Sequence, residues 1–364
     1  MSQAVVKAMS PYQRFLFDLN GFIVVRNALS KAEVKSMNTA VDANLTAAVA
    51  RESAMLRNTK ADTHMTEKNP RIDLGGCLNW EKAVGGDTFR SLLAHSQLVP
   101  YLNAMLGPGY RMDHQPLVLI NQANSEGFSL HGGPLSATRP EKKRKYEYET
   151  VEVPDEVLDT GKFNPALQYK FSPDGGMFNS LVAMSVALSP VKGNVDGGFC
   201  ILRGSHKLNF PVPTNFANGD VPEFREHIHV PDLEAGDVVF FSEATVHGCM
   251  PWKNAEMQRR CALFRFAPSI LSYGRAYFSG DSNFGMSESK TSDREDFLPF
   301  GISRHVWEHE LTEAQKSVLL PPFTNRCERP ELQVDADGKV TVHTFERSKV
   351  KKAHDRAIFG TDYF

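Results

Sequence analysis

Two histidines and a pair of arginines, each at one end of an apolar run, are the residues best placed to do chemistry. His247 closes the run GDVVFFSEATVHG and His131 closes FSLHGGP. A histidine on the rigid edge of a strand is a good metal ligand, because the strand already fixes its backbone. Arg259 and Arg260 open the next run, RRCALFRF. An arginine there can reach the same cavity and bind a carboxylate through two hydrogen bonds.

A single histidine beside an apolar run is more often structural than a ligand, so the other histidines need weighing. His206, in a Gly-Ser-His turn, is expected to bond neighbouring backbone, and the pair His227 and His229 is expected on a solvent-facing edge strand. The segment HVWEH at 305–309 matches the inverted zinc-peptidase signature H-x-x-E-H. Its surroundings are typical of an amphipathic surface helix. The joint pattern of His131, His247 and Arg259 is therefore the preferred site.

The elements that position these residues begin with two helices. Residues 11–26 predict a short amphipathic helix, a turn at Asn20-Gly21 and a strand. Ser30 and Glu33 form a capping-box signature that predicts a helix from Lys31 to about Arg51. Residues 52–80 are polar and irregular, and another helix is predicted over Thr88–Leu106 before Gly107.

Short apolar or alternating runs dominate the rest of the chain. Strands are predicted at Gln115–Asn121, Ser180–Leu188, Gly198–Leu202, Asp237–Phe241 and Cys261–Phe266. Helical character returns near Arg304–Leu319, and a last strand is predicted at Lys339–Thr344. Short strands separated by Gly, Pro and Asp turns indicate a mainly β fold, a barrel or sandwich with flanking helices.

Composition narrows the function classes. The 364 residues are 41% hydrophobic and 23% charged, with a net charge of −2, which gives no support for nucleic acid or an anionic membrane as a partner. The five cysteines are scattered and form no CxxC pair, so neither a disulfide framework nor a thiolate zinc site is expected. No run of 18 apolar residues occurs. We expect a cytoplasmic protein that does not span a membrane.

Four segments, in order and spacing, resemble the phytanoyl-CoA dioxygenase family of iron- and 2-oxoglutarate-dependent oxygenases. They are FLFDLNGFIVVRNALSKAEV, GGFCILRGSHK, AGDVVFFSEATVHG and the arginine that opens the last core strand, within residues 13–270. The resemblance implies a double-stranded β-helix (jelly-roll or cupin-like) core. It also implies Fe(2+) held by His131 and His247, and an arginine that binds the far carboxylate of 2-oxoglutarate.

Assigning the co-substrate contacts leaves alternatives open. Arg259 is the preferred arginine, because it opens the pattern Arg-x-Ala/Cys that leads into a hydrophobic run. Arg260 is the alternative, since a shift of one residue along a strand turns the side chain to the opposite face. Gln115 and Asn121, on the predicted strand upstream of His131, are candidates for polar contacts to the co-substrate.

The sequence departs from the family at one position. The usual first motif, His-x-Asp, supplies the carboxylate of a two-histidine-one-carboxylate triad, whereas this chain reads His131-Gly132-Gly133. In one interpretation Gly133 leaves a coordination position for chloride or bromide, as in the non-haem iron halogenases that carry His-x-Gly. In a second, Glu243 or Asp174 supplies the carboxylate and the enzyme is a hydroxylase. In a third, the protein binds a small molecule without turnover.

These observations predict one domain over residues 1–364. Residues 134–176 form a long insertion that we expect to act as a lid, since a loop of such length is usually functional or disordered. Residues 271–364 form a C-terminal extension expected to pack on the core. The expected function is oxidation of an unactivated C–H bond in a small-molecule substrate.

Overall fold

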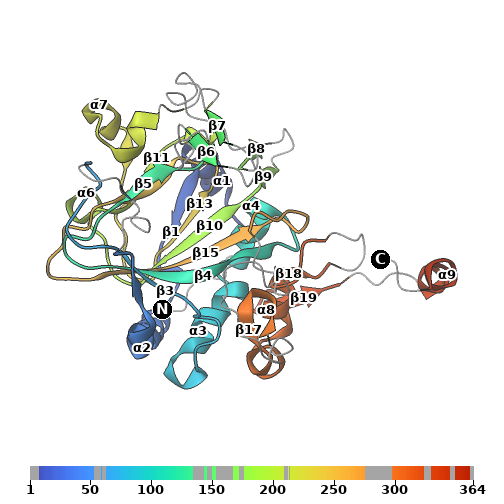
Figure 1. Cartoon of the computed structure of the whole chain (residues 1–364). Helices are drawn as coiled ribbons and strands as arrows, with labels where there is room; N and C mark the ends of the chain where they lie inside the picture. The colour runs from blue at the N-terminus through green and yellow to red at the C-terminus, as the bar shows by residue number, and fades with distance from the viewer. Residues whose placement is uncertain are drawn as a thin grey trace.

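Two antiparallel sheets form the centre of the computed structural model (Figure 1). The larger sheet has the strand order β1-β13-β10-β15-β4-β3-β2 and the smaller has β12-β11-β14-β5. The structure describes residues 8–52, 59, 63–133, 143–145, 150–152, 167–171, 176–208, 212, 214–274, 297–323, 329–344 and 349–360. The mainly β architecture with flanking helices is the one predicted, and it is a double-stranded β-helix.

The strands of the two sheets are distributed between Phe22 and Ala267. In the larger sheet they are β1 (Phe22–Val25), β2 (Val49–Ala50), β3 (Ile72–Leu74), β4 (Arg111–Asn121), β10 (Val182–Ala187), β13 (Val238–Ser242) and β15 (Arg259–Ala267). In the smaller sheet they are β5 (Phe128–His131), β11 (Gly198–Leu202), β12 (Ile228–His229) and β14 (His247–Met250).

Helices and four short strand pairs complete the described elements. The helices are α1 (Pro11–Asn20), α2 (Lys31–Asn44), α3 (Gly86–Ser91), α4 (Val99–Leu106), α6 (Gly193–Asp196), α7 (Pro222–Arg225), α8 (Glu313–Val318) and α9 (Lys349–Phe359). The strand pairs are β6 (Lys143–Lys145) with β7 (Thr150–Glu152), β8 (Tyr169–Phe171) with β9 (Met177–Asn179), β16 (Phe297–Leu298) with β17 (Ile302–Ser303), and β18 (Glu331–Val334) with β19 (Val340–His343).

Alternation along the strands divides the core into two layers. Met184, Phe240 and Phe264 belong to a buried cluster that also contains apolar residues of α2, α3 and α4, so this face of the larger sheet is covered by helices. Val239 and Phe241 belong to the other cluster, which contains Phe199 of the smaller sheet. Because successive side chains of a strand point to opposite faces, the odd-numbered residues of β13 and β15 face the space between the sheets.

The N-terminal predictions were confirmed in part. Helix α1, the left-handed Gly21 and strand β1 follow the expected order, and Ser30 forms a capping box at the start of α2. The predicted end of α2 at Arg51 was wrong, because Val49–Ala50 pairs with β3 instead. Strand β3 itself lies within residues 52–80, for which we predicted irregular chain. Sheet pairing between distant segments overrides local helical preference.

Other boundaries also moved. The single helix predicted over Thr88–Leu106 is interrupted between Ala94 and Val99, since its second half begins with Pro100 at an early position. The predicted helix near Arg304–Leu319 comprises a π-helical turn, Val306–Glu310, followed by α8. The core strands were found within a few residues of their predicted positions, although β4 begins at Arg111 and not at Gln115.

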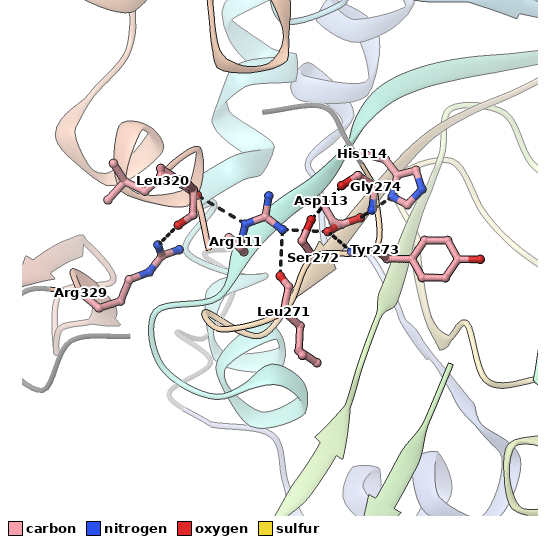
Figure 2. Close-up of polar contacts among 10 residues, drawn as sticks. Arg111, Asp113, His114, Leu271, Ser272, Tyr273, Gly274, Leu320 and Arg329 are labelled. Atoms are coloured by element: carbon pink, nitrogen blue, oxygen red, sulfur yellow. Dashed lines mark hydrogen bonds and ion pairs between the residues drawn. The ribbon is translucent and has the colours of Figure 1, made fainter. Parts of the chain in front are cut away.

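Hydrogen bonds of two buried arginines fix the C-terminal segment to the start of β4 (Figure 2). The Arg111 guanidinium lies 2.8 Å from Asp113 and donates to the carbonyl oxygens of Leu271 and Leu320. Arg329 donates to the carbonyl oxygens of Gly109 and Pro321. Ile302 and Leu319, in this part of the chain, are fully buried, whereas helix α9 lies apart from the two sheets (Figure 1), so the packing of the whole extension on the core stays a prediction.

Three sequence predictions concern residues or properties that the structure describes only in part. Most of the predicted lid at 134–176 lies outside the described residues, as does Asp174, so both stay predictions. Cys77, Cys200, Cys249 and Cys261 are free thiols, and Cys327 lies outside the described residues. None of the helices in the described ranges is long and apolar enough to cross a membrane.

Candidate metal and co-substrate site

His131 and His247 lie directly opposite each other on neighbouring strands. The last residue of β5 pairs with the first residue of β14, and the two ring centroids are 4.2 Å apart. Directly opposed side chains of an antiparallel pair share one face of the sheet. The antiparallel pairing therefore brings together two imidazoles that are 116 positions apart in the chain.

Hydrogen bonds to the backbone decide which nitrogen of each imidazole is available. Nδ1 of His131 lies 2.9 Å from the carbonyl oxygen of Ser129, and Nδ1 of His247 lies 2.7 Å from that of Thr245. A carbonyl oxygen only accepts, so each Nδ1 is the donor. In a neutral ring this leaves Nε2 with its lone pair. A second nitrogen held by a carbonyl is the usual support of a metal-binding histidine.

The surroundings keep both rings neutral. Phe128 packs 4.6 Å from the His131 ring and Phe241 packs 4.7 Å from the His247 ring, centroid to centroid. Burial, reinforced by the neighbouring His247, lowers the pKa of His131 to about 3, and burial likewise lowers the pKa of His247. Neutral imidazole is the form that binds a metal ion, so both rings are ready to bind at neutral pH.

Glu243 places a carboxylate beside the two histidines. Its Oε2 lies 3.5 Å from Nε2 of His247, and its Oε1 accepts from Nε of Arg265 at 2.5 Å. Burial by itself would raise the pKa of Glu243, but the charge and hydrogen bond of Arg265, together with the two neighbouring imidazoles, lower the pKa to about 2. The carboxyl group is therefore ionised although its side chain is only 7% exposed.

Gly132 and Gly133 follow His131 and pack against the segment that carries Glu243. The Gly133 amide donates to the carbonyl oxygen of Glu243 at 3.3 Å. A Cβ on Gly133 would lie 1.8 Å from the carbonyl oxygen of Ala244, and φ is +42° at this residue. A side chain at Gly133 would thus need the backbone to move. The absence of the usual carboxylate at this position has a steric reason in this fold.

The donor set of His131, His247 and Glu243 fits a divalent iron ion, provided that the Glu243 carboxylate turns toward it. Two imidazole nitrogens and one carboxylate are the ligands of the two-histidine-one-carboxylate iron sites. Among the residues that the structure describes, no group of three His, Cys, Asp or Glu side chains already has the geometry of a metal site. Glu243 pairs with Arg265 in this conformation, so a rotation of its carboxylate would be needed to complete the set.

Arg259 lies between the sheets and Arg260 lies outside. Arg259 is 3% exposed, lines the same cavity as the two histidines, and donates from Nη1 to Oδ1 of Asn121 at 2.9 Å. Arg260 turns to the helix-covered face, where it pairs with Asp42 at 2.7 Å. Of the two arginines considered from the sequence, the structure brings only Arg259 to the cavity. Asn121 supports it from the neighbouring strand.

Gln115 lies apart from the cavity. Its side chain is exposed and donates from Nε2 to the carbonyl oxygen of Phe300 at 2.8 Å. The register of β4 with β15 shifts between Leu263 and Arg265, so that Leu263 faces Leu117 and Arg265 faces His114. This irregularity removes Gln115 from the alternation that places the later residues of β4 between the sheets.

The cavity has a volume of about 250 Å³ and is lined by both sheets. Besides the histidines and Arg259, its wall includes three arginines that the sequence reasoning missed, Arg51, Arg71 and Arg265. Arg265 could have been found as another odd-numbered residue of the strand that begins at Arg259. Arg51 and Arg71 gave no signal, because the strands that they flank, β2 and β3, are only two and three residues long.

The remaining candidate histidines lie elsewhere. The side chains of His305 and His309 are 71% and 64% exposed, on the π-helical turn before α8. His206 is buried, and its Nε2 lies 3.0 Å from the carbonyl oxygen of Asp18. His227 is exposed, and His229 ends strand β12. None of these side chains lines the described cavity.

Part of the chain matches the model of a known protein family. Residues 165–261 match the family model of phytanoyl-CoA dioxygenase (PhyH). No curated protein sequence matches the chain. HygX from Streptomyces hygroscopicus, solved with nickel, 2-oxoglutarate and hygromycin B bound, is similar over 73% of this chain and 90% of that chain, with a TM-score of 0.52 and 18% identity.

Two further solved structures are similar at lower scores. AviO1 from Streptomyces viridochromogenes Tue57 aligns over 75% of this chain and 100% of that chain, with a TM-score of 0.46 and 13% identity. The non-haem α-ketoglutarate-dependent epimerase SnoN from nogalamycin biosynthesis aligns over 77% and 95%, with a TM-score of 0.45 and 18% identity. At these identities the similarity concerns the fold.

Proposed function

We propose that this protein is an iron(II)- and 2-oxoglutarate-dependent oxidoreductase that acts on a C–H bond of a small molecule. The observation that carries the proposal is the meeting of His131 and His247 across two strands, with Arg259 in the same cavity. The match of residues 165–261 to the phytanoyl-CoA dioxygenase family supports it independently.

Each polar residue of the site has a separate task in this proposal. His131 and His247 hold the iron through Nε2, and Glu243 supplies the carboxylate ligand. Arg259, held by Asn121, binds the far carboxylate of 2-oxoglutarate and so orients it toward the metal. When bound, iron and 2-oxoglutarate supply, with dioxygen, the oxidising power to cleave the substrate C–H bond, while 2-oxoglutarate becomes succinate and carbon dioxide.

The apolar side chains have a task as well. Phe128, Phe199 and Phe241 flank the two histidines. They exclude water from one side of the site, which strengthens the electrostatic contacts inside it and protects the oxidant from side reactions. The protein side chains thus bind and orient the ligands and exclude water, while the oxidising power comes from the metal and the co-substrate.

Glu243 favours an ordinary oxygenase over a halogenase. It supplies the negative charge that Gly133 lacks, at 3.5 Å from Nε2 of His247. Halogenation is the second candidate, because Glu243 also pairs with Arg265. If that pair persists with iron bound, chloride or bromide would fill the position that a carboxylate usually takes, and halogen would be transferred to the substrate.

Anaerobic titration with iron(II) and 2-oxoglutarate tests the proposal. A chelate should produce a weak visible charge-transfer band that is lost in His247→Ala and kept in His227→Ala, whose histidine is exposed away from the cavity. The absence of any band in the wild-type protein would contradict the proposal and favour a member of the fold that binds a small molecule without turnover.

The same titration separates the two candidate reactions. A band that is indifferent to chloride and bromide but is weakened by Glu243→Gln favours the oxygenase with Glu243 as ligand. A band that shifts on adding halide and is unchanged by Glu243→Gln favours the halogenase.

A further inference from the structure

A row of cationic side chains crosses one end of the larger sheet. Arg259 on β15 is paired with Asn121 on β4. The pairing of Ile72 with Ile120 continues by one residue to place Arg71 opposite Asn121. The pairing of Ala50 with Ile72 likewise places Arg51 opposite Arg71, and the Arg51 amide donates to the Arg71 carbonyl oxygen at 3.0 Å.

Residues opposed across antiparallel strands project from the same face of the sheet. The three arginines of this row all line the cavity that contains His131 and His247. They are separated in the sequence by up to 208 positions. The row therefore extends the positive charge of the proposed co-substrate site toward the edge of the sheet formed by β3 and β2.

The hydrogen-bonding capacity of Arg71, within this row, is only partly used. Its side chain is 9% exposed. Nε and Nη2 donate to the two carboxylate oxygens of Asp73 at 2.8 Å and 3.1 Å, and its guanidinium lies 5.3 Å from the centroid of the Phe128 ring. No acceptor among the described residues reaches Nη1 of Arg71. A nearly buried guanidinium with an unused donor in a cavity wall is suited to an anion.

The charges around the row also favour an anion at Arg71. Asp73 is shared with Arg51, whose Nε lies 2.6 Å from Oδ2, so the carboxylate does not belong to Arg71 alone. Arg265 is paired with Glu243 at the other end of the cavity. In the proposed function Arg259 is used by the far carboxylate of 2-oxoglutarate. Arg71 is then left facing the cavity with a donor for a second anionic molecule.

We propose that Arg71 binds an anionic group of the substrate, which makes the substrate a small-molecule acid, either a carboxylate or a phosphate monoester. The inference rests on the proposed function, because it takes Arg259 as the site of 2-oxoglutarate. It adds a specificity-determining residue that neither the sequence pattern nor the similarity in fold identifies.

The position of Phe128 limits where the reacting carbon can lie. Phe128 contacts both the Arg71 guanidinium and the His131 ring, whose centroid lies 4.6 Å from its own. A substrate anchored at Arg71 therefore has to span about one aromatic ring to reach the metal. The carbon that reacts is then a few bonds from the anionic group, and the apolar chain between them packs on Phe128.

Binding measurements that do not depend on turnover test this inference. The thermal midpoint of the protein loaded with zinc(II) and 2-oxoglutarate is measured with butanoate, hexanoate and octanoate, with their methyl esters, and with butyl and hexyl phosphate. We expect one or more acids to raise the midpoint in a saturable way while the matching neutral ester does not. Comparing the increase in thermal midpoint between the carboxylic acids and the alkyl phosphates of the panel shows which of the two anionic groups the site binds.

Variants assign the effect to Arg71. In Arg71→Leu the apparent affinity for the acid should fall at least about tenfold, and Arg71→Lys should recover part of it, because the charge is kept. The affinity for 2-oxoglutarate should stay within about twofold of the wild type in both variants. Arg260→Leu, which removes an arginine on the other face of the sheet, serves as the matched control.

Three results would overturn the inference. They are equal binding of acids and esters, no binding by any acid or phosphate of the panel, and a loss of 2-oxoglutarate binding in Arg71→Leu as large as in Arg259→Leu. The last would assign Arg71 to the co-substrate. A protein that binds no 2-oxoglutarate but still binds an acid through Arg71 would refute the proposed function and the role of the acid as its substrate, while the anion site at Arg71 would stand.

Discussion

The Gly133 amide donates to the carbonyl oxygen of Glu243 at 3.3 Å. The residue that lacks the usual carboxylate thus lies against the residue that has one. The carboxylate of Glu243 is directed to His247 and Arg265. This hydrogen bond joins the residues just after β5 to the connection between β13 and β14. It therefore links the segment that carries His131 to the segment that carries Glu243 and His247.

Replacing Glu243 should weaken metal binding. Glu243→Gln keeps the size of the side chain but removes its charge, so we expect the affinity for iron(II) to fall by at least about tenfold. Anaerobic calorimetry measures the change. Glu234→Gln, an exposed glutamate at the turn before β13, should bind iron like the wild type. An unchanged affinity in Glu243→Gln would exclude Glu243 as a ligand.

Restoring a side chain at Gly133 should damage the fold before it helps the site. Gly133→Asp and Gly133→Ala both place a Cβ against the Ala244 carbonyl oxygen at a residue with φ of +42°. We expect each to lower the free energy of unfolding by at least about 2 kcal/mol, from backbone strain and overpacking. Chemical denaturation checks this value.

The matched control for Gly133 is Gly75→Ala, where a new Cβ meets nothing within 4 Å. This variant should stay within about 0.5 kcal/mol of the wild type. If Gly133→Asp proves as stable as Gly75→Ala, the steric explanation for the missing carboxylate is wrong.

Arg259 and Arg260 offer a test on adjacent residues. Arg259→Leu removes a buried guanidinium from the cavity, and we expect the affinity for 2-oxoglutarate to fall about 100-fold, the value of two charge-assisted hydrogen bonds. Arg260→Leu breaks the contact with Asp42 on the outer face and should leave that affinity unchanged. Equal losses in the two variants would contradict the assignment to Arg259.

The metal-free protein should lose stability on acidification from about pH 6.5 toward pH 3. The folded-state pKa of His131 is lowered from 6.5 to about 3 by burial. In that interval the unfolded chain binds a proton that the folded chain does not, so acid favours unfolding. His131→Gln should flatten this part of the curve of unfolding free energy against pH. An unchanged slope in that variant would refute the explanation.

Asp113 should contribute to stability at neutral pH through the C-terminal anchor (Figure 2). Burial by itself would raise its pKa, but hydrogen bonds from His114 and from the amides of Tyr273 and Gly274 lower it to about 2. The ionised form is therefore stabilised in the folded protein. That stability is present above about pH 4 and is lost as the pH falls through 2.

Asp113→Asn should lower the free energy of unfolding by about 2 kcal/mol at pH 7, at about 1.4 kcal/mol for each unit of pKa shift. Urea titrations at pH 7 and pH 3 measure both the loss and its decrease in acid. Asp87→Asn, an exposed aspartate on α3, is the control. A loss that is the same at both pH values would argue against the ionised carboxylate as its cause.

The residues around the histidines could be predicted from sequence because their signals are local. Arg259 opens strand β15 and His131 ends strand β5, as their runs predict. His247 was expected at the end of the strand before it but is the first residue of β14, after a turn that follows β13. The choice of Arg259 over Arg260 still needed the register, since adjacent strand residues point to opposite faces. The pairing of β15 with β4 and the burial of Arg259 decide it.

What the tertiary structure alone decided are contacts between segments far apart in the chain. The orientation of Glu243 toward His247 depends on Arg265, and the row of Arg51, Arg71 and Arg259 depends on the pairing of β2, β3, β4 and β15. Strands as short as β2 and β3 carry too few residues for a periodic signal. Strand β3 forms because the edge of β4 offers it hydrogen bonds, and β2 pairs with β3 in turn. Sequence spacing therefore determined the candidate ligands, while sheet pairing determined which charges share their cavity.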